Sequence, residues 1–107
     1  MSSEDKERFK RGVRDWAKKL DVEVNTITLR AMKNKWASCS TERNLTFNTE
    51  LLDFEPDVQA YVIVHELLHF FVPNHGRLWK SLMRAHLGDY EALDLRLRRH
   101  HRATLAG

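Results

Sequence analysis

The run YVIVHELLHFFVPNH, from Tyr61 to His75, limits more than any other feature what this chain can fold into. Its apolar residues recur at almost every position, so a helix built from it is hydrophobic all round and has to be buried. Yet His65, Glu66 and His69 interrupt the run. Burying a polar group without a partner costs free energy, and an unpaired carboxylate costs still more. The fold must therefore supply something that compensates for their burial.

The spacing of these three residues indicates a metal ion. His65 and His69 are four positions apart, so both imidazoles lie on one helix face within reach of a single ion. Glu66 is turned by about 100° from His65 and approaches the same ion from the side. This is the HExxH pattern of zinc peptidases, in which the glutamate is the general base. The alternative is a pair of hydrogen-bonded core histidines, with Glu66 paired to a nearby Lys or Arg.

A third ligand candidate follows directly. Pro73 and Asn74 predict the end of the helix, and His75 can then turn back toward the ion, with Gly76 behind it. Three protein ligands leave the fourth position of a zinc ion for water, which is typical of a catalytic site. Glu91 and His86 are the alternatives to His75 as third ligand.

The rest of the chain predicts an α+β fold. The expected elements are an amphipathic helix over 3–20, strands at 27–31, 36–39 and 45–48, a helix over 57–72, and two helices around 78–83 and 90–97. We expect one domain over residues 1–107, with an N-terminal helix, a small three-stranded sheet, a buried HExxH helix and two C-terminal helices. The central helix should lie between the sheet and the C-terminal helices. Trp16, Trp36 and Trp79 are expected core anchors.

Composition and charge set weaker expectations. The start of the chain lacks the apolar segment of a signal peptide, and the central run is too interrupted for a membrane span. Cys39 is the only cysteine, so no internal disulfide forms, which fits a cytoplasmic location. We expect its side chain to be a small buried group.

The net charge is +3, and much of the surplus lies in RLRRHHR, Arg96 to Arg102. This segment is a possible phosphate contact, although a solvated helix end, with His100 and His101 in solvent, is the simpler interpretation. No recognised nucleic-acid-binding signature accompanies it.

Several motifs occur in a fixed order between Thr26 and Leu97: KWASCS (35–40), LTFNTELL (45–52), Pro56, YVIVHELLH (61–69), PNH (73–75) and LW (78–79). Together they resemble the YgjP-like zinc metallopeptidases, which are relatives of the SprT-like proteases. Lys35 and Ala37 stand where this family has Arg and Gly, and neither change removes a ligand or the base.

The resemblance implies one zinc ion per chain, bound by His65, His69 and His75, with Glu66 as catalytic base and a peptide or protein as substrate. Tyr61 and Arg77 are candidate oxyanion stabilisers, although a core tyrosine is the simpler interpretation of Tyr61.

An extended substrate would pair along the strand Trp36–Cys39. Two other functions are compatible with the sequence. One is a pseudoenzyme or adaptor in which zinc staples a peptide-binding fold, and the other is a SprT-like nucleic-acid-associated protease that uses Arg96–Arg102.

Overall fold

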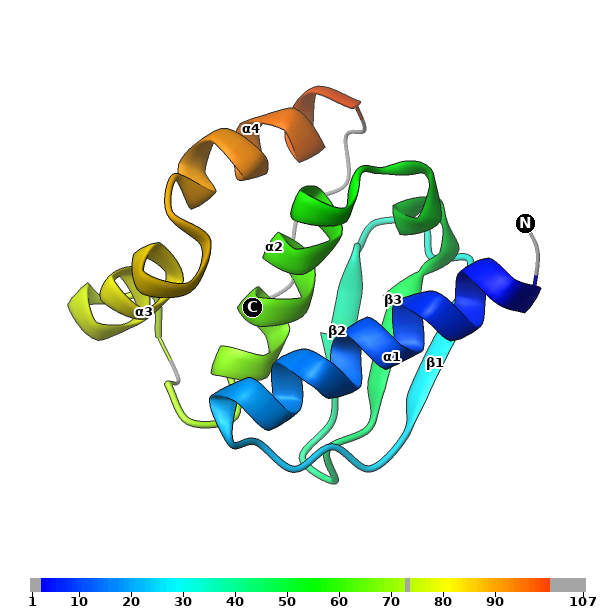
Figure 1. Cartoon of the computed structure of the whole chain (residues 1–107), viewed down its shortest axis with the longest axis horizontal. Coiled ribbons are helices and arrows are strands. Elements are labelled where there is room, and N and C mark those ends of the chain that lie inside the picture. The colour runs from blue at the N-terminus through cyan, green and yellow to red at the C-terminus, as the bar shows by residue number, and fades with distance from the viewer. Residues whose placement is uncertain (1–2, 73, 101–107) are drawn as a thin grey trace.

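Four α-helices and a three-stranded sheet make up the fold over residues 3–72 and 74–100, the part that the computed structural model describes (Figure 1). The elements follow the order α1 (Ser3–Leu20), β1 (Ile27–Arg30), β2 (Ala37–Cys39), β3 (Leu45–Asn48), the 3₁₀ helix η1 (Thr49–Asp53), α2 (Pro56–Leu68), α3 (Arg77–Leu87) and α4 (Tyr90–His100). The predicted α+β class is confirmed.

Helix α1 covers one face of the sheet (Figure 1). Its buried residues Phe9, Val13 and Ala17 are spaced four apart, so they form one apolar stripe along the helix. Acidic residues begin the helix and lysines end it, as the helix dipole favours. Phe9 packs edge to face against Phe47 of β3, with ring centroids 5.1 Å apart. This contact fixes the helix on the sheet.

The sheet has the strand order β1-β3-β2, with β1 parallel and β2 antiparallel to β3. Ala37 lies opposite Phe47, and both are fully buried. The next pair, Ser38 and Thr46, is only half-buried. One face therefore packs in the core while the other approaches solvent, a common arrangement for small sheets with antiparallel pairs. Strand β2 is at the edge of this sheet.

The strand predictions were one residue too long in two places, and η1 was missed. Strand β1 ends at Arg30, before exposed Ala31. Trp36 precedes β2, and its carbonyl accepts a hydrogen bond from the Asn48 N–H at 2.9 Å. Trp36 is fully buried, as expected, whereas Trp16 is only half-buried.

Helix α2 is the centre of the molecule. Every residue from Tyr61 to Leu68 is buried. The helix contacts α1 and β2 on one side and α3 and α4 on the other, as Figure 1 shows. The expectation that this helix lies between the sheet and the C-terminal helices is confirmed.

The predicted end of this helix at Val72 was wrong, because α2 ends at Leu68. The N–H groups of residues 69–71 bond to carbonyls only three positions back, at 3.1–3.2 Å, so the backbone tightens into a narrower turn. Pro73 follows in the sequence and disfavours helical geometry in the residue before it. As a result Phe71 is 49% exposed instead of buried.

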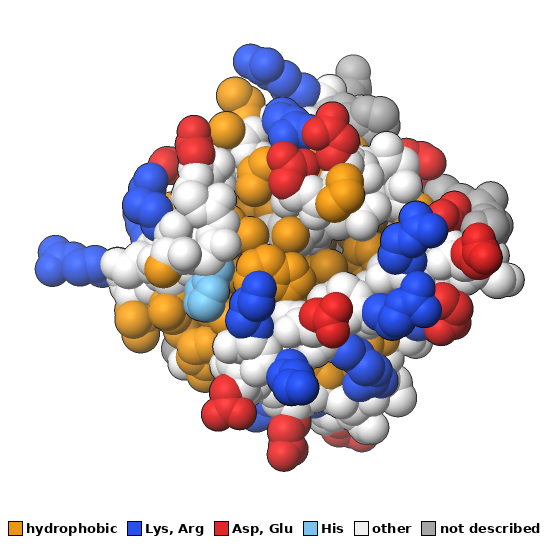
Figure 2. Space-filling model, in the orientation of Figure 1, with side chains coloured by type: hydrophobic (Ala, Val, Ile, Leu, Met, Phe, Trp, Pro, Cys, Tyr) orange, Lys and Arg blue, Asp and Glu red, His pale blue; other side chains and the backbone are white. Residues whose placement is uncertain are grey.

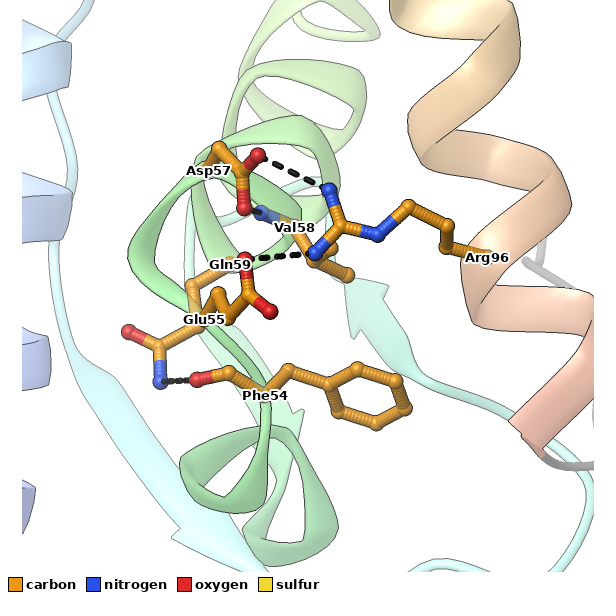
Figure 3. A network of polar contacts seen from close by, with 6 residues as sticks. All are labelled: Phe54, Glu55, Asp57, Val58, Gln59 and Arg96. Carbon is orange, nitrogen blue, oxygen red and sulfur yellow. Dashed lines mark hydrogen bonds and ion pairs between the residues drawn. The ribbon is translucent and has the colours of Figure 1, made fainter.

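Arg96 of α4 links that helix to the start of α2. Its guanidinium contacts the carboxylates of Glu55 and Asp57 at 2.7 and 2.9 Å (Figure 3). Both carboxylates lie near the N-terminus of α2, where negative charge is favourable. Arg96, the first residue of the basic run, is therefore ion-paired within the fold. Residues 101–102 of that run lie outside the described residues, as does the side chain of His100.

A second link joins the middles of α2 and α4. The buried Tyr61 hydroxyl donates a hydrogen bond to Asp94 Oδ1 at 2.8 Å. Arg98 Nε donates to the other oxygen of the same carboxylate at 2.7 Å. Burial, and next the bond to Asp94, raise the pKa of the Tyr61 phenol. Tyr61 is thus the expected core tyrosine.

The surface mixes charges of both signs around a central band of hydrophobic side chains on the face shown in Figure 2. Phe71, Leu78 and Leu95 are large exposed hydrophobic residues. Cys39 is also exposed, so its expected burial was wrong: it is the last residue of a short strand at the edge of the sheet. No helix among the described residues is long and apolar enough to cross a membrane.

Replacing Asn48 with Ala should destabilise the fold by about 2–3 kcal/mol. Its fully buried amide donates to the carbonyls of Met32 and Lys35 at 2.9 and 3.0 Å and accepts from the Glu50 N–H at 3.0 Å. All three partners would lose their bond. Urea denaturation measures the change. Asn34→Ala, at an exposed position between Met32 and Lys35, is the control and should shift stability by less than about 0.5 kcal/mol.

The raised pKa of Tyr61 predicts that stability falls as the pH rises above about 10, the ordinary tyrosine value. In that range the folded chain keeps a proton that the unfolded chain loses, so unfolding becomes more favourable with pH. Tyr61→Phe lacks this contribution. The stability difference between wild type and variant, measured by denaturation at pH 8 and pH 11, should therefore shrink. An unchanged difference would contradict the prediction.

Candidate metal centre

Three imidazoles meet at the C-terminal end of α2. His65 comes from the buried last turn of the helix, His69 caps its end, and His75 comes from the loop before α3. The ring centroids are separated by 4.8 Å (His65–His69) and by 5.0 Å for each of the other two pairs. One nitrogen of each ring lies within 4.8 Å of the other two. The three histidines are therefore positioned for a metal ion.

The closest pair of nitrogens tests whether a metal fits. His69 Nε2 and His75 Nε2 are 3.2 Å apart. Two nitrogens that share one tetrahedral zinc at about 2.0–2.1 Å lie about 3.3 Å apart. Imidazole nitrogens are also suitable donors for zinc and other first-row transition metals. The spacing and the chemistry of the donors both fit such an ion.

Burial decreases across the site. His65 is 3% exposed, His69 is half-buried and His75 is exposed. The inner part of the site is enclosed by the core, while its outer part faces solvent. A site with this gradient of burial holds the innermost histidine, His65, rigidly and still admits molecules from outside.

A tight turn brings His75 back to the helix. Asn74 Oδ1 accepts a hydrogen bond from the Gly76 N–H at 3.0 Å, and α3 begins at the next residue. A Cβ at position 76 would lie only 2.7 Å from that oxygen, so a larger residue there would disturb the turn. The close approach of the Asn74 side chain therefore explains why a glycine follows the sequence PNH.

Trp79 of α3 supports two of the histidines. It is buried, and its ring centroid lies 4.4 Å from that of His75 and 5.2 Å from that of His65. On its other side it packs against Tyr90 of α4 at 5.7 Å. The prediction of a core tryptophan is confirmed. Its contact with the histidines was not predicted, although the four-residue step from His75 to Trp79 was a visible signal.

Glu66 is 1% exposed, and its Oε2 lies 3.0 Å from His65 Nδ1. An ionised carboxylate only accepts hydrogen bonds, so His65 Nδ1 then carries the proton. The lone pair of His65 is in that case on Nε2, the nitrogen that remains for a metal. The described residues include no Lys or Arg ion-paired with Glu66.

Cys39 lies near the same carboxylate. Partial desolvation, and next the negative charge of Glu66, raise the pKa of its thiol. The thiol is nevertheless exposed and does not belong to the histidine group. The exposed end of β2 and the buried Glu66 of α2 thus face a common region.

The other sequence candidates lie elsewhere. His86 packs against Trp16 of α1, with ring centroids 6.1 Å apart, and Glu91 pairs with Arg84 at 3.0 Å. Neither joins the three histidines. Of the two oxyanion candidates, Tyr61 is hydrogen-bonded to α4 and Arg77 is exposed at the start of α3.

The fold is shared with two archaeal proteins of known structure. The metallopeptidase zymogen jannalysin of Methanocaldococcus jannaschii is 26% identical, with a TM-score of 0.77 over 86% of this chain and 95% of that one. The metallopeptidase zymogen abylysin of Pyrococcus abyssi is 14% identical, with a TM-score of 0.81 over 92% and 99%, and at that identity shows likeness of fold alone. No curated protein sequence gives a significant match.

Residues 1–100 match the model of the YgjP-like metallopeptidase domain. The match includes all three histidines and Glu66. With a fold shared with metallopeptidases and three imidazoles placed for a metal, the chain belongs to the YgjP-like family of metallopeptidases.

Proposed function

We propose that this protein is a zinc-dependent peptidase that hydrolyses peptide bonds, with one zinc ion held by His65, His69 and His75 and with Glu66 as general base. The observation that carries this proposal is the meeting of three imidazoles beside a buried carboxylate. Residues 1–107 would act as one metallopeptidase domain. Because Cys39 is the sole cysteine, we also keep the proposal of a cytoplasmic location.

Zinc is the metal that this donor set favours. Mg²⁺ and Ca²⁺ take oxygen ligands, whereas three neutral imidazoles with an open position are typical of catalytic zinc. When bound, zinc supplies Lewis acidity toward the scissile carbonyl and lowers the pKa of water toward neutrality.

Glu66 would act on the proton. Its carboxylate takes the proton from the attacking water and passes it to the leaving amine. The apolar neighbours of α2 exclude other water, and the 3.0 Å contact with His65 holds the carboxylate beside the ligands. The base and the first ligand are thus held by the same rigid helix.

Strand β2 is the proposed binding edge for substrate. It is one of the two outer strands of the sheet, it pairs only with β3 among the described strands, and it contacts α2. An extended peptide would add to it through main-chain hydrogen bonds. Such an edge does not require a chain end, which favours cleavage inside a peptide or protein.

The metal proposal predicts about one zinc per chain in protein purified without added metal, measured by elemental mass spectrometry. His65→Ala, His69→Ala and His75→Ala should each lower metal affinity at least tenfold, because each removes one of three ligands. His86→Ala is the matched control and should keep the zinc, because His86 lies against Trp16. If the His75 variant retained zinc and the His86 variant lost it, His86 instead of His75 would be the third ligand.

The base proposal predicts that Glu66→Gln keeps zinc and loses about 10²–10⁴-fold in kcat on a quenched fluorescent peptide. Glu7→Gln, which alters an exposed carboxylate on α1, is the control for general effects of charge. If the Glu66 variant keeps full turnover, Glu66 is not the base. If the wild type binds zinc and peptide without cleaving it, the adaptor function is the better explanation.

A further inference from the structure

A cavity of about 250 Å³ lies directly beside the histidines, between α2, α3 and α4. His65 and His75 form one side of it. Three aromatic residues from the three helices also line it: Tyr61, Trp79 and Tyr90. Its volume equals that of about eight water molecules at 30 Å³ each, enough for one side chain but below the roughly 300–1,000 Å³ of small-molecule sites. The size indicates a place for a single substrate group.

Charged residues line the rest of the cavity, and they differ in whether they have an ion-pair partner. The carboxylate of Asp94 accepts from both Tyr61 and Arg98. Glu91 is paired with Arg84 at 3.0 Å. Both acidic groups of the wall therefore already carry a donor.

Lys80 is different. It is exposed and lines both this cavity and the adjoining groove along α3, where Arg77 and Arg84 also lie. No carboxylate of the described residues lies within 4.0 Å of its ammonium group. It is also a cation in the first turn of a helix, where the dipole disfavours positive charge. Its charge is thus available to an anion that enters from outside.

Trp79 lines the same wall, but its indole Nε1 is fully buried and has no hydrogen-bond partner among the described residues. A group that enters the cavity therefore cannot reach this N–H. The other cation of the wall, Arg98, is ion-paired with Asp94 at 2.7 Å. Lys80 is therefore the cation of this wall that has no carboxylate partner among the described residues.

We propose that this cavity binds a carboxylate of the substrate beside the scissile bond, through the Lys80 ammonium. The inference rests on the proposed peptidase function and adds a preference for anionic substrates. The carboxylate has two sources, the side chain of a glutamate within the peptide or the free C-terminus of a short peptide. Both present the same group to the same ammonium.

The test uses quenched fluorescent peptides that differ only by Glu, Gln or Lys at one position on either side of the cleaved bond, each as free acid and as C-terminal amide. Wild type should cleave the Glu peptide with a kcat/KM about two- to fivefold above that of the Gln peptide, the range for a partly exposed ion pair. If the advantage follows the free acid instead of Glu, the terminal carboxylate is the ligand.

Variants assign the effect to the cavity. Lys80→Met should abolish the preference and Lys80→Glu should reverse it toward the Lys peptide. Lys18→Met removes the same charge from an exposed position on α1 and should leave the preference intact.

A binding measurement tests this inference independently of peptidase activity. Fluorescence anisotropy with labelled Glu and Gln peptides on the Glu66→Gln protein reports the preference without turnover. If wild type cleaves none of the peptides but the bound Glu peptide is favoured through Lys80, the proposed activity fails and the cavity assignment holds. If peptides are cleaved with a Glu to Gln ratio that the Lys80 variants do not change, or if Lys peptides are preferred by wild type, the cavity assignment is overturned.

Discussion

The burial of His65 and Glu66 in the last turn of α2 is the constraint on which the rest of the structure depends. Two polar groups at 3% and 1% exposure require partners, and their mutual contact at 3.0 Å satisfies one atom of each. Keeping them buried requires cover on every side of α2. Helix α1 and strand β2 cover one side, and α3 and α4 cover the other. The small size of the domain follows from how little is needed to enclose one helix.

Helix α4 supports the three histidines of the candidate metal centre, although none of the three lies on it. Arg96 holds it to the start of α2, and Asp94 holds it to the middle through Tyr61. These links keep Tyr90 against Trp79, which in turn packs against His65 and His75. The same links use Arg96 and Arg98 within the fold, which weakens the alternative in which the basic run binds nucleic acid.

The sequence was a good guide wherever the physical signal was local. Periodicity located α1, and the step from His65 to His69 placed both imidazoles together, because helix geometry fixes that relation. The turn at Asn74 and Gly76 brings His75 back to the other two histidines, as the sequence predicted. Contacts between distant residues left no such signal. Tyr61 and Asp94 are separated by 33 positions, and neither segment contains a pattern that predicts their hydrogen bond. The early end of α2 was missed because the apolar run continues past Leu68, although the backbone had already tightened. Cys39 was misplaced because its exposure depends on the strand order, with β2 at the edge.

The decrease in burial from His65 to His75 also determines how an ion reaches and leaves the centre. Among the described residues, the innermost histidine is buried and the third is exposed, so molecules from outside meet the exposed side of the centre first. A chelator, a second metal and a substrate would then approach the centre from the same side. Loading of the ion and turnover of peptide would compete there, and a bound peptide should slow the exchange of the metal beneath it.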